Sequence, residues 1–231
     1  MTSFQSDRTT WGRPVGDADS DATLILVRHG ETVWNVEGRW QGHKDSRLTD
    51  LGREQARRIA ARLAPLKIGA VYSSDLGRAR EVADIIAAAH GLPVITREDL
   101  RERSYGVLEG KTNQEAAASQ GGWFITWQAD HLRQAPPAGE TEQMVADRVL
   151  EALSEIADSY PGQTVVVSTH GGPIKIAFYH TLSIPLALWR LTWISNGSIT
   201  ILRGNRDVMR VVCFNDVCHL EATPVTDKME D

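Results

Sequence analysis

The sequence has few cysteines, no long apolar run and no excess of positive charge. Cys213 and Cys218 are its only cysteines in 231 residues, too few for the disulfide framework of a small secreted domain, so we expect a reduced, cytoplasmic setting. No apolar run approaches the ~20 residues that a membrane-spanning helix needs. The net charge is −5, whereas nucleic-acid-binding domains usually carry a basic face. We therefore expect contact with neither membranes nor nucleic acid.

The two ends of the chain differ in composition from its middle. Residues 1–20 are polar, contain Gly, Pro, Asp and Ser, and lack the apolar stretch of a secretory signal, which predicts a flexible N-terminal tail. We expect a single domain over residues 21–222, which suits the chain length, and a C-terminal tail over residues 223–231. A monomer and a homodimer are both compatible with the sequence.

Apolar runs alternate with amphipathic segments along this domain. Their patterns predict three strands and a hairpin, at residues 22–27, 70–73, 163–168 and 198–214. Apolar residues at helical spacing, with polar caps, predict the intervening helices, at residues 49–64, 76–90, 141–159 and 174–182. Strand–helix alternation of this kind predicts an α/β fold, a three-layer α/β/α sandwich with a mostly parallel central sheet.

Residues 109–139 interrupt the alternation. The segment is long and mixed, and it contains Trp123, Phe124 and Trp127. It can be a helical excursion that packs on the core, or a cap over a pocket, since long connections in α/β domains often carry function. The two interpretations are compatible, and we predict a small helical cap insertion.

Basic side chains follow three of the predicted strands, at the point where each strand ends. Arg28 and His29 follow the first strand, Arg78 lies just beyond the second, and His170 follows the third. Because ligands in open α/β sheets bind beyond the carboxyl ends of the strands, we expect these four side chains to meet. Arginine binds phosphate oxygens bidentately, and helix N-termini add N–H donors. The cluster therefore predicts a site for a small phosphorylated molecule.

His29 has the chemistry of a nucleophile toward phosphorus. A neutral imidazole can attack phosphorus and be regenerated by water, which divides hydrolysis into two easier steps. Nearby guanidiniums disfavour the imidazolium, so we expect His29 to be neutral at pH 7. Glu102 is the candidate acid for the leaving alkoxide, because a nearby phosphate raises a carboxyl pKa. This chemistry needs no metal, and no metal-like spacing is present, so we expect no metal ion and no other cofactor.

The motifs around these residues resemble those of a known family. They run in order over most of residues 22–220: Leu26-Val-Arg-His-Gly-Glu-Thr32, Trp34-Asn35, Gln41-Gly42, Leu48-Thr-Asp-Leu-Gly52, Tyr72-Ser-Ser-Asp-Leu-Gly-Arg-Ala79, Arg101-Glu-Arg103, Gly139-Glu-Thr141, Ser168-Thr-His-Gly-Gly172 and Ser195-Asn-Gly-Ser198. The ordered set resembles the histidine phosphatase superfamily, which includes the cofactor-dependent phosphoglycerate mutases. The resemblance implies a phosphoglycerate mutase-like fold and a phosphohistidine intermediate.

The resemblance also implies a role for each matching residue. His29 would be the phosphorylated nucleophile, and Glu102 the proton donor and later the base that activates water. Arg28, Arg78 and His170 would surround the transferred phosphoryl group. Further contacts to phosphate or at the pocket rim are implied for Asn35, Gln41, Gly42, Gly171 (through its backbone N–H) and Thr141.

Three functions are compatible with these motifs: hydrolysis, phosphoryl transfer to another hydroxyl of the same substrate, and binding without turnover. Mutases of the family resemble one another in a longer cap with more basic residues, whereas the segment between Gly110 and Gly139 offers only Lys111 and Arg133 besides His131. A smaller, less basic cap favours hydrolysis. We expect a histidine acid phosphatase-type enzyme that hydrolyses phosphomonoesters of small metabolites. A phosphoglycerate mutase is the alternative, and a non-catalytic phospholigand-binding protein is the second alternative.

Seven tryptophans are many for this length. Trp34 and Trp40 lie near the first motif and Trp123 and Trp127 in the expected cap, so we expect some of these four to line the pocket. Tryptophans in the cap would suit an acyl, aryl or sugar-like leaving group, which favours the broad-specificity phosphatase branch of the family. For Trp189 and Trp193 we expect packing in the core. His131 is expected to be an ordinary histidine.

Overall fold

A computed structural model describes residues 20–131 and 133–220 of the chain. The tails expected over residues 1–20 and 223–231 lie outside these residues, apart from Ser20. The described chain is built around a six-stranded sheet with the order β3-β2-β4-β1-β5-β6. Its strands are β1 (Ala22–Arg28), β2 (Ile68–Ser74), β3 (Val94–Arg97), β4 (Thr164–Thr169), β5 (Ile199–Gly204) and β6 (Met209–Asp216).

The first four strands pair in parallel, and the β5–β6 hairpin joins the edge of β1 antiparallel. The mostly parallel sheet and the C-terminal hairpin are therefore confirmed. β3 was not expected. It is an edge strand of four residues that pairs only with β2 among the described strands, and its residues are exposed or half-buried. So short and partly polar a segment gives little apolar signal.

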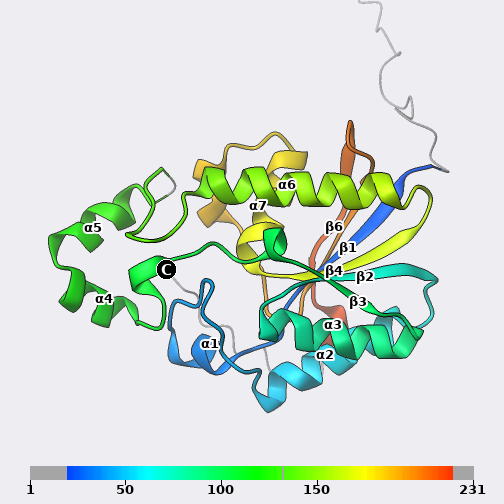
Figure 1. Cartoon of the computed structure of the whole chain (residues 1–231), viewed down its shortest axis with the longest axis horizontal. Helices are drawn as coiled ribbons and strands as arrows, with labels where there is room; N and C mark the ends of the chain where they lie inside the picture. The colour runs from blue at the N-terminus through cyan, green and yellow to red at the C-terminus, as the bar shows by residue number, and fades with distance from the viewer. Residues whose placement is uncertain (1–19, 132, 221–231) are drawn as a thin grey trace, which may run out of the picture.

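Helices cover both faces of the sheet (Figure 1). On one face lie α2 (Asp50–Leu63) and α3 (Gly77–His90), and on the other lie α6 (Glu142–Ser159) and α7 (Gly171–Thr181). Strand β1 explains the layering, because its alternate side chains pack into two hydrophobic cores, one on each face of the sheet. Leu24 and Leu26 pack with α6 and α7, whereas Ile25 and Val27 pack with α2 and α3. A continuous apolar run was therefore a correct sign of a strand buried on both faces.

The predicted helices are present, with small shifts at their ends. Helix α3 ends as expected at Gly91, which adopts the left-handed conformation with φ 64°. Helix α7 begins at Gly171, three residues before the expected start at Ile174, because the glycine pair of the motif forms its first turn. Shorter elements that were not predicted are α1 (Val33–Glu37) and the 3-10 helices η1 (Glu98–Leu100), η2 (Gly106–Leu108), η3 (Leu186–Leu191) and η4 (Cys218–Leu220).

The segment expected to form the cap contains α4 (Asn113–Gln120) and α5 (Gly122–Ala129), which lie beyond one end of the sheet (Figure 1). The cap has a small core of its own, in which Phe124 and Trp127 pack with Leu108 and Ala116. Buried Arg103 joins this core to α6 through an ion pair between its Nη1 and Glu142 Oε1 of 2.6 Å. The cap is thus attached to the sheet domain through a buried charge pair.

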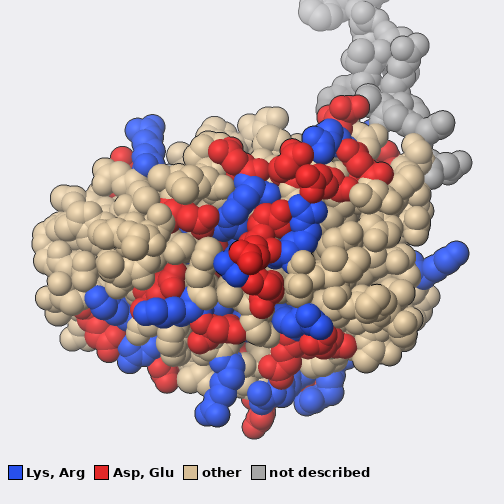
Figure 2. Space-filling view, viewed as in Figure 1, with Lys and Arg blue, Asp and Glu red and all other residues tan. Residues whose placement is uncertain are grey.

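Acidic and basic side chains interleave across the middle of the face in Figure 2, whereas the cap side of that face carries few charges. The ion pairs in the described residues include Arg97 with Asp99 and with Glu155, the latter on α6. Within residues 20–131 and 133–220, no helix is both long enough and apolar enough to cross a membrane.

Candidate active site

The carboxyl ends of β1, β4 and β2 are neighbours in the sheet, and the predicted site residues lie there. Arg28 at the end of β1 is in register with Thr169 at the end of β4, and β2 flanks β4 on its other side. The residues that follow β1 and β4 are His29 and His170, whose ring centroids are 5.2 Å apart at an angle of 63°. The structure therefore brings the two histidines together, as the strand-end pattern predicted.

His29 is 3% exposed, and its hydrogen bond defines its tautomer. Its Nδ1 lies 2.8 Å from the carbonyl oxygen of Gly30. A carbonyl can only accept, so Nδ1 donates and Nε2 keeps its lone pair. Burial lowers the pKa of His29 well below 6.5, and the charges of Arg78 and Arg28 lower it further. At pH 7 this imidazole is neutral, with Nε2 available for attack on an electrophile.

Arg78, at the start of α3, is 1% exposed and is fixed by the backbone of the loop around Gly42. Its Nη2 donates to the Gly42 carbonyl at 2.7 Å, and its Nη1 donates to the Lys44 carbonyl at 2.9 Å and to Asp45 Oδ1 at 3.0 Å. Gly42 has φ 57°, and a Cβ there would meet the Glu109 carboxylate at 2.3 Å. Glycine at this position therefore lets the loop turn and point its carbonyl at the guanidinium.

The buried His170 precedes helix α7 and completes the set of four predicted residues. Its Nε2 is 2.9 Å from Ser74 Oγ at the end of β2. Burial lowers the pKa of His170 well below 6.5, and Arg78, His29 and Arg28 lower it further. The guanidinium of Arg28 is held by Ile194, whose carbonyl accepts from Nη1. The name floor is used below for Arg28, His29, Arg78 and His170.

Unpaired polar atoms concentrate in the predicted site. Among the described residues, eight buried side-chain nitrogen or oxygen atoms have no hydrogen-bond partner, and four of them are Arg28 Nε, Arg78 Nε, His170 Nδ1 and Gln41 Oε1. Buried polar atoms are nearly always paired in native proteins. Two guanidinium donors and an imidazole nitrogen without partners in one place are what an anionic ligand requires.

Glu102 lies beside the floor at the N-terminus of α7. Its Oε1 accepts from the Arg103 N–H at 2.9 Å, and its Oε2 accepts from the Gly172 N–H at 3.1 Å. A Cβ on Gly172 would come within 2.2 Å of Oε1, so only glycine allows this approach. The second glycine of the motif is therefore explained by the carboxylate that packs against it.

Some of the remaining predicted residues are buried or border the cavity, whereas others use their side-chain oxygens in hydrogen bonds within the protein. Gln41 is buried and Gly171 borders the cavity described below. The side-chain oxygens of Asn35 and Thr141 instead support the backbone. Asn35 Oδ1 accepts from Thr32 N at 3.1 Å and from Asn196 Nδ2 at 3.2 Å, and Thr141 Oγ1 accepts from Met144 N at 3.2 Å as the N-cap of α6.

Asn196 had no predicted role, although it lies in one of the family motifs. Its Nδ2 is 3.2 Å from the His29 carbonyl and 3.3 Å from the Gly30 carbonyl. It therefore holds the backbone that accepts the hydrogen bond of the His29 imidazole. Its position between Ser195 and Gly197 of the family motif was the sequence signal that could have identified Asn196 as a residue of the site.

A cavity of about 320 Å³ opens between the floor and the cap. Of the floor residues, its described lining includes Arg28 alone, together with Glu102, Gly171 and Gly172 beside the floor. The residues that line the rest of it are called the wall: Trp40, Tyr105, Trp127, Gln128, His131, Lys175, Trp189, Thr192, Trp193 and Ile194. Of the four candidate tryptophans, Trp40 and Trp127 line the cavity, whereas Trp34 and Trp123 are absent from its described lining. The expectation of core packing for Trp189 and Trp193 was wrong, because both line the cavity.

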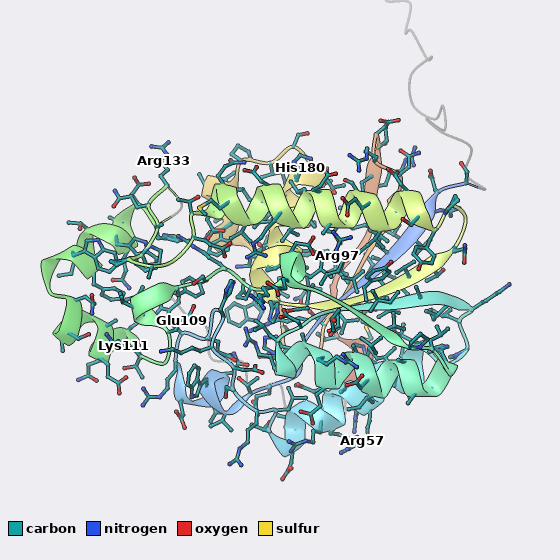
Figure 3. All side chains as sticks on the ribbon, viewed as in Figure 1. Arg57, Arg97, Glu109, Lys111, Arg133 and His180 are labelled. Atoms are coloured by element: carbon teal, nitrogen blue, oxygen red, sulfur yellow. The ribbon has the colours of Figure 1, made fainter. Side chains whose placement is uncertain are left out.

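One lysine, Lys175 on α7, reaches the wall, whereas the lysine and arginine of the cap do not. Lys111 and Arg133 are absent from the described cavity lining, and Lys111 Nζ donates to Ser119 Oγ at 3.1 Å. In Figure 3 Arg133 points outward at the top of the cap, while Glu109 lies between cap and core. Lys175 was missed, although it follows Gly171 by one helical turn and so shares its face.

Glu109 connects the floor to the wall. Its Oε1 accepts from the His43 N–H at 3.0 Å and from the Tyr105 N–H at 2.9 Å, and its Oε2 accepts from the Lys44 N–H at 3.0 Å. One buried carboxylate thus connects the loop that holds Arg78 to the segment that contains Tyr105.

Among the described residues, no cluster of three or more His, Cys, Asp or Glu side chains is placed to hold a metal ion.

Residues 24–217 match the model of the histidine phosphatase superfamily (branch 1). The chain belongs to this superfamily. It is 41% identical over 206 residues to phosphoglycerate mutase-like protein 4 of Arabidopsis thaliana, which covers 87% of this chain and 88% of that protein. It is 34% identical over 215 residues to the metal-independent phosphoserine phosphatase of the same plant, with coverage of 92% and 89%.

The solved structure of Bacillus stearothermophilus YhfR is also similar, with a TM-score of 0.80 and 39% identity over 86% of this chain and 99% of that one. The expected family and α/β fold of this histidine phosphatase superfamily member are therefore confirmed. Its relatives include phosphatases and phosphoglycerate mutase-like proteins.

Proposed function

We propose that this superfamily member is a phosphatase that hydrolyses phosphomonoesters of small metabolites through a phosphohistidine at His29. The observation that carries the proposal is the state of that imidazole. It is neutral, its Nδ1 donates to the Gly30 carbonyl, and its Nε2 lone pair lies among two guanidiniums and a second imidazole. A phosphoryl group there would meet a nucleophile and fixed cations without reorganisation of the protein.

In the first step, His29 Nε2 forms a bond to phosphorus while the ester P–O bond breaks. Arg28 and Arg78 neutralise the charge on the equatorial oxygens, the neutral imidazole of His170 hydrogen-bonds to the phosphoryl group, and Glu102 gives its proton to the leaving alkoxide. In the second step, Glu102 takes a proton from water as the water oxygen attacks phosphorus. The N–P bond breaks, His29 is restored, and inorganic phosphate leaves.

The cavity wall supports hydrolysis over internal transfer. A mutase has to hold its phosphorylated intermediate and exclude water, whereas both basic residues of the cap lie outside the described lining of this cavity. The 41% identity to a phosphoglycerate mutase-like protein is the observation that favours the second candidate, a phosphoglycerate mutase.

One experiment separates the two candidates. Purified protein is incubated with 3-phosphoglycerate, a sugar phosphate, a nucleotide and 4-nitrophenyl phosphate, and both free phosphate and 2-phosphoglycerate are measured. Phosphate release with trapping of an acid-labile phosphoenzyme in the wild type, and none in His29→Ala, supports the phosphatase. Conversion of 3-phosphoglycerate to 2-phosphoglycerate faster than phosphate release would establish the mutase instead.

A further inference from the structure

The imidazole of His170 has two possible tautomers, and only one of them suits an anionic ligand. Burial, and after it the charge of Arg78, lowers the pKa of His170 well below 6.5, so at pH 7 its ring carries one proton. The ring nitrogen that holds this proton donates a hydrogen bond, while the other nitrogen presents a lone pair. Next to a phosphoryl oxygen the N–H attracts and the lone pair repels. The contribution of His170 therefore depends on which nitrogen is protonated.

The hydrogen bonds of Ser74 favour one of the two tautomers. Ser74 is the last residue of β2 and is fully buried. Its Oγ accepts from the Leu76 N–H at 3.3 Å and lies 2.9 Å from His170 Nε2. Among the described residues, Nε2 is the one acceptor within reach of the hydroxyl proton. Because buried polar groups are nearly always hydrogen-bonded, the hydroxyl donates and Nε2 accepts.

The other ring nitrogen of His170, Nδ1, then carries the proton. Nδ1 is buried and has no hydrogen-bond partner among the described residues. His170 is also the N-cap of α7, a position from which side chains usually accept from an N–H of the first turn. Its side chain makes no such bond in the described helix, as expected if Nδ1 holds a proton and not a lone pair. The structure thus leaves Nδ1–H available to a ligand.

This N–H belongs to a group of donors beside the nucleophile. The ring of His170 lies edge-on to that of His29, and the charges of Arg28 and Arg78 act on both imidazoles. Arg28 Nε and Arg78 Nε are likewise buried without a partner among the described residues. Donors that are fixed before the reaction stabilise developing charge without reorganisation. A neutral imidazole adds such a donor without the cost of burying a further charge.

We propose that Ser74 is a positioning residue whose hydroxyl donates to His170 Nε2 and so keeps the proton on Nδ1, from which it is donated to the transferred phosphoryl group. The inference rests on the proposed phosphatase function, and it adds a residue that acts on the reaction through His170. The fold makes this contact possible because β2 and β4 are neighbours in the sheet, so Ser74 and His170 lie at adjacent strand ends.

The test reads the tautomer and the activity in the same variants. Nitrogen-15 NMR of the ligand-free protein distinguishes a protonated from an unprotonated ring nitrogen, and His170→Gln identifies the signals of His170. The wild type is compared with Ser74→Ala, Ser74→Thr and Ser168→Ala. Ser168 is the matched control, because it is a fully buried serine near the end of β4 whose Oγ donates to the Ala79 carbonyl at 2.8 Å and not to an imidazole.

In the wild type and in Ser168→Ala we expect the proton of His170 on Nδ1. Ser74→Ala should populate the tautomer with the proton on Nε2, and Ser74→Thr should restore the first tautomer. For an alkyl phosphate, kcat/KM should fall by about tenfold in Ser74→Ala, the size of one hydrogen bond, and inhibition by vanadate should weaken by a similar factor. Both values should stay close to those of the wild type in Ser168→Ala.

The inference is overturned if the wild type carries the proton on Nε2, or if Ser74→Ala changes neither the tautomer nor kcat/KM. Equal losses of kcat/KM in Ser74→Ala and Ser168→Ala would also overturn it, in favour of a purely structural hydroxyl. If the extra methyl group prevents Ser74→Thr from folding, the comparison of Ser74→Ala with Ser168→Ala decides alone. Failure of the proposed function looks different, because the wild type would then release no phosphate from any substrate, 4-nitrophenyl phosphate included, and form no phosphoenzyme, whichever tautomer His170 adopts.

Discussion

The floor and the wall of the cavity are built by different means. Floor side chains are charged or polar, all but Arg28 are buried, and short hydrogen bonds to backbone carbonyls fix most of them, such as the 2.7 Å bond between Arg78 and Gly42. Wall side chains are mainly aromatic and contact one another at ring-centroid distances such as 4.7 Å for Trp40 and Tyr105. The floor suits one reaction on one group, while the wall offers a surface on which the rest of a substrate is distinguished.

The largest effect is expected at the nucleophile of the floor. His29→Ala leaves no atom to receive the phosphoryl group, so kcat should fall by about 10⁴-fold or more, as when other nucleophiles are removed. Phosphate release and phosphoenzyme trapping measure it. His180→Ala, at an exposed position on α7, is the matched control and should retain wild-type rates. Wild-type turnover in the His29 variant would contradict the mechanism.

Glu102 lies where floor and wall meet, and its replacement should discriminate between leaving groups. Glu102→Gln removes the proton donor, so kcat for alkyl phosphates should fall by about 10²–10³-fold. With 4-nitrophenyl phosphate, whose leaving group needs no proton, the first step should stay fast and phosphoenzyme should accumulate. Rapid-quench measurements follow both steps, with exposed Glu98→Gln as the control. Equal losses for both substrate classes would exclude the acid role.

Arg103 tests the support of the wall. It is 1% exposed, pairs with Glu142 and lies 5.7 Å from the Trp127 ring. Arg103→Met leaves the buried carboxylate of Glu142 without its partner, so the free energy of unfolding should drop by about 3–5 kcal/mol. Urea denaturation measures this, and exposed Arg133→Met should change the value little. An unchanged midpoint would mean that the pair does not stabilise the cap.

The sequence indicated the floor far better than the wall, for a physical reason. Each floor residue adjoins a strand whose apolar run is local, and parallel strands bring their ends to one edge. The wall depends on contacts between distant segments, such as the ring contact of His131 in the cap with Trp189 in η3. No local pattern marks a 3-10 helix as short as η3, so Trp189 could not be assigned to the cavity.

The ends of the helices also differ in how well the sequence predicts them. The C-terminal end of α3 could be predicted from Gly91, because the left-handed backbone conformation that ends the helix depends on the residue at that position alone. The start of α7 at Gly171 could not be predicted in this way, because two consecutive glycines usually indicate a loop. There they form a helix turn whose N–H at Gly172 is accepted by the Glu102 carboxylate, a partner from another part of the chain.

The floor should also make stability depend on pH. Burial lowers the pKa of both His29 and His170, so in the folded protein they bind fewer protons than in the unfolded chain. The free energy of unfolding should therefore decrease as pH falls below about 6.5, by at most about 1.4 kcal/mol per pH unit for each histidine. His29→Gln should lessen this slope in urea titrations between pH 7.5 and 5. A slope equal to that of the wild type would show that His29 does not contribute.

The smallest effect is expected at Thr141, which the family motif assigns to the pocket rim and whose hydroxyl caps α6. Thr141→Ala leaves the Met144 N–H without that acceptor, so unfolding should become easier by about 0.5–2 kcal/mol. Thr141→Ser keeps the hydroxyl and should retain stability. Because Thr141 is absent from the described cavity lining, kcat/KM should change less than about twofold in either variant. A rise in KM with unchanged stability would instead place this hydroxyl on the substrate, and would extend the wall to the start of α6.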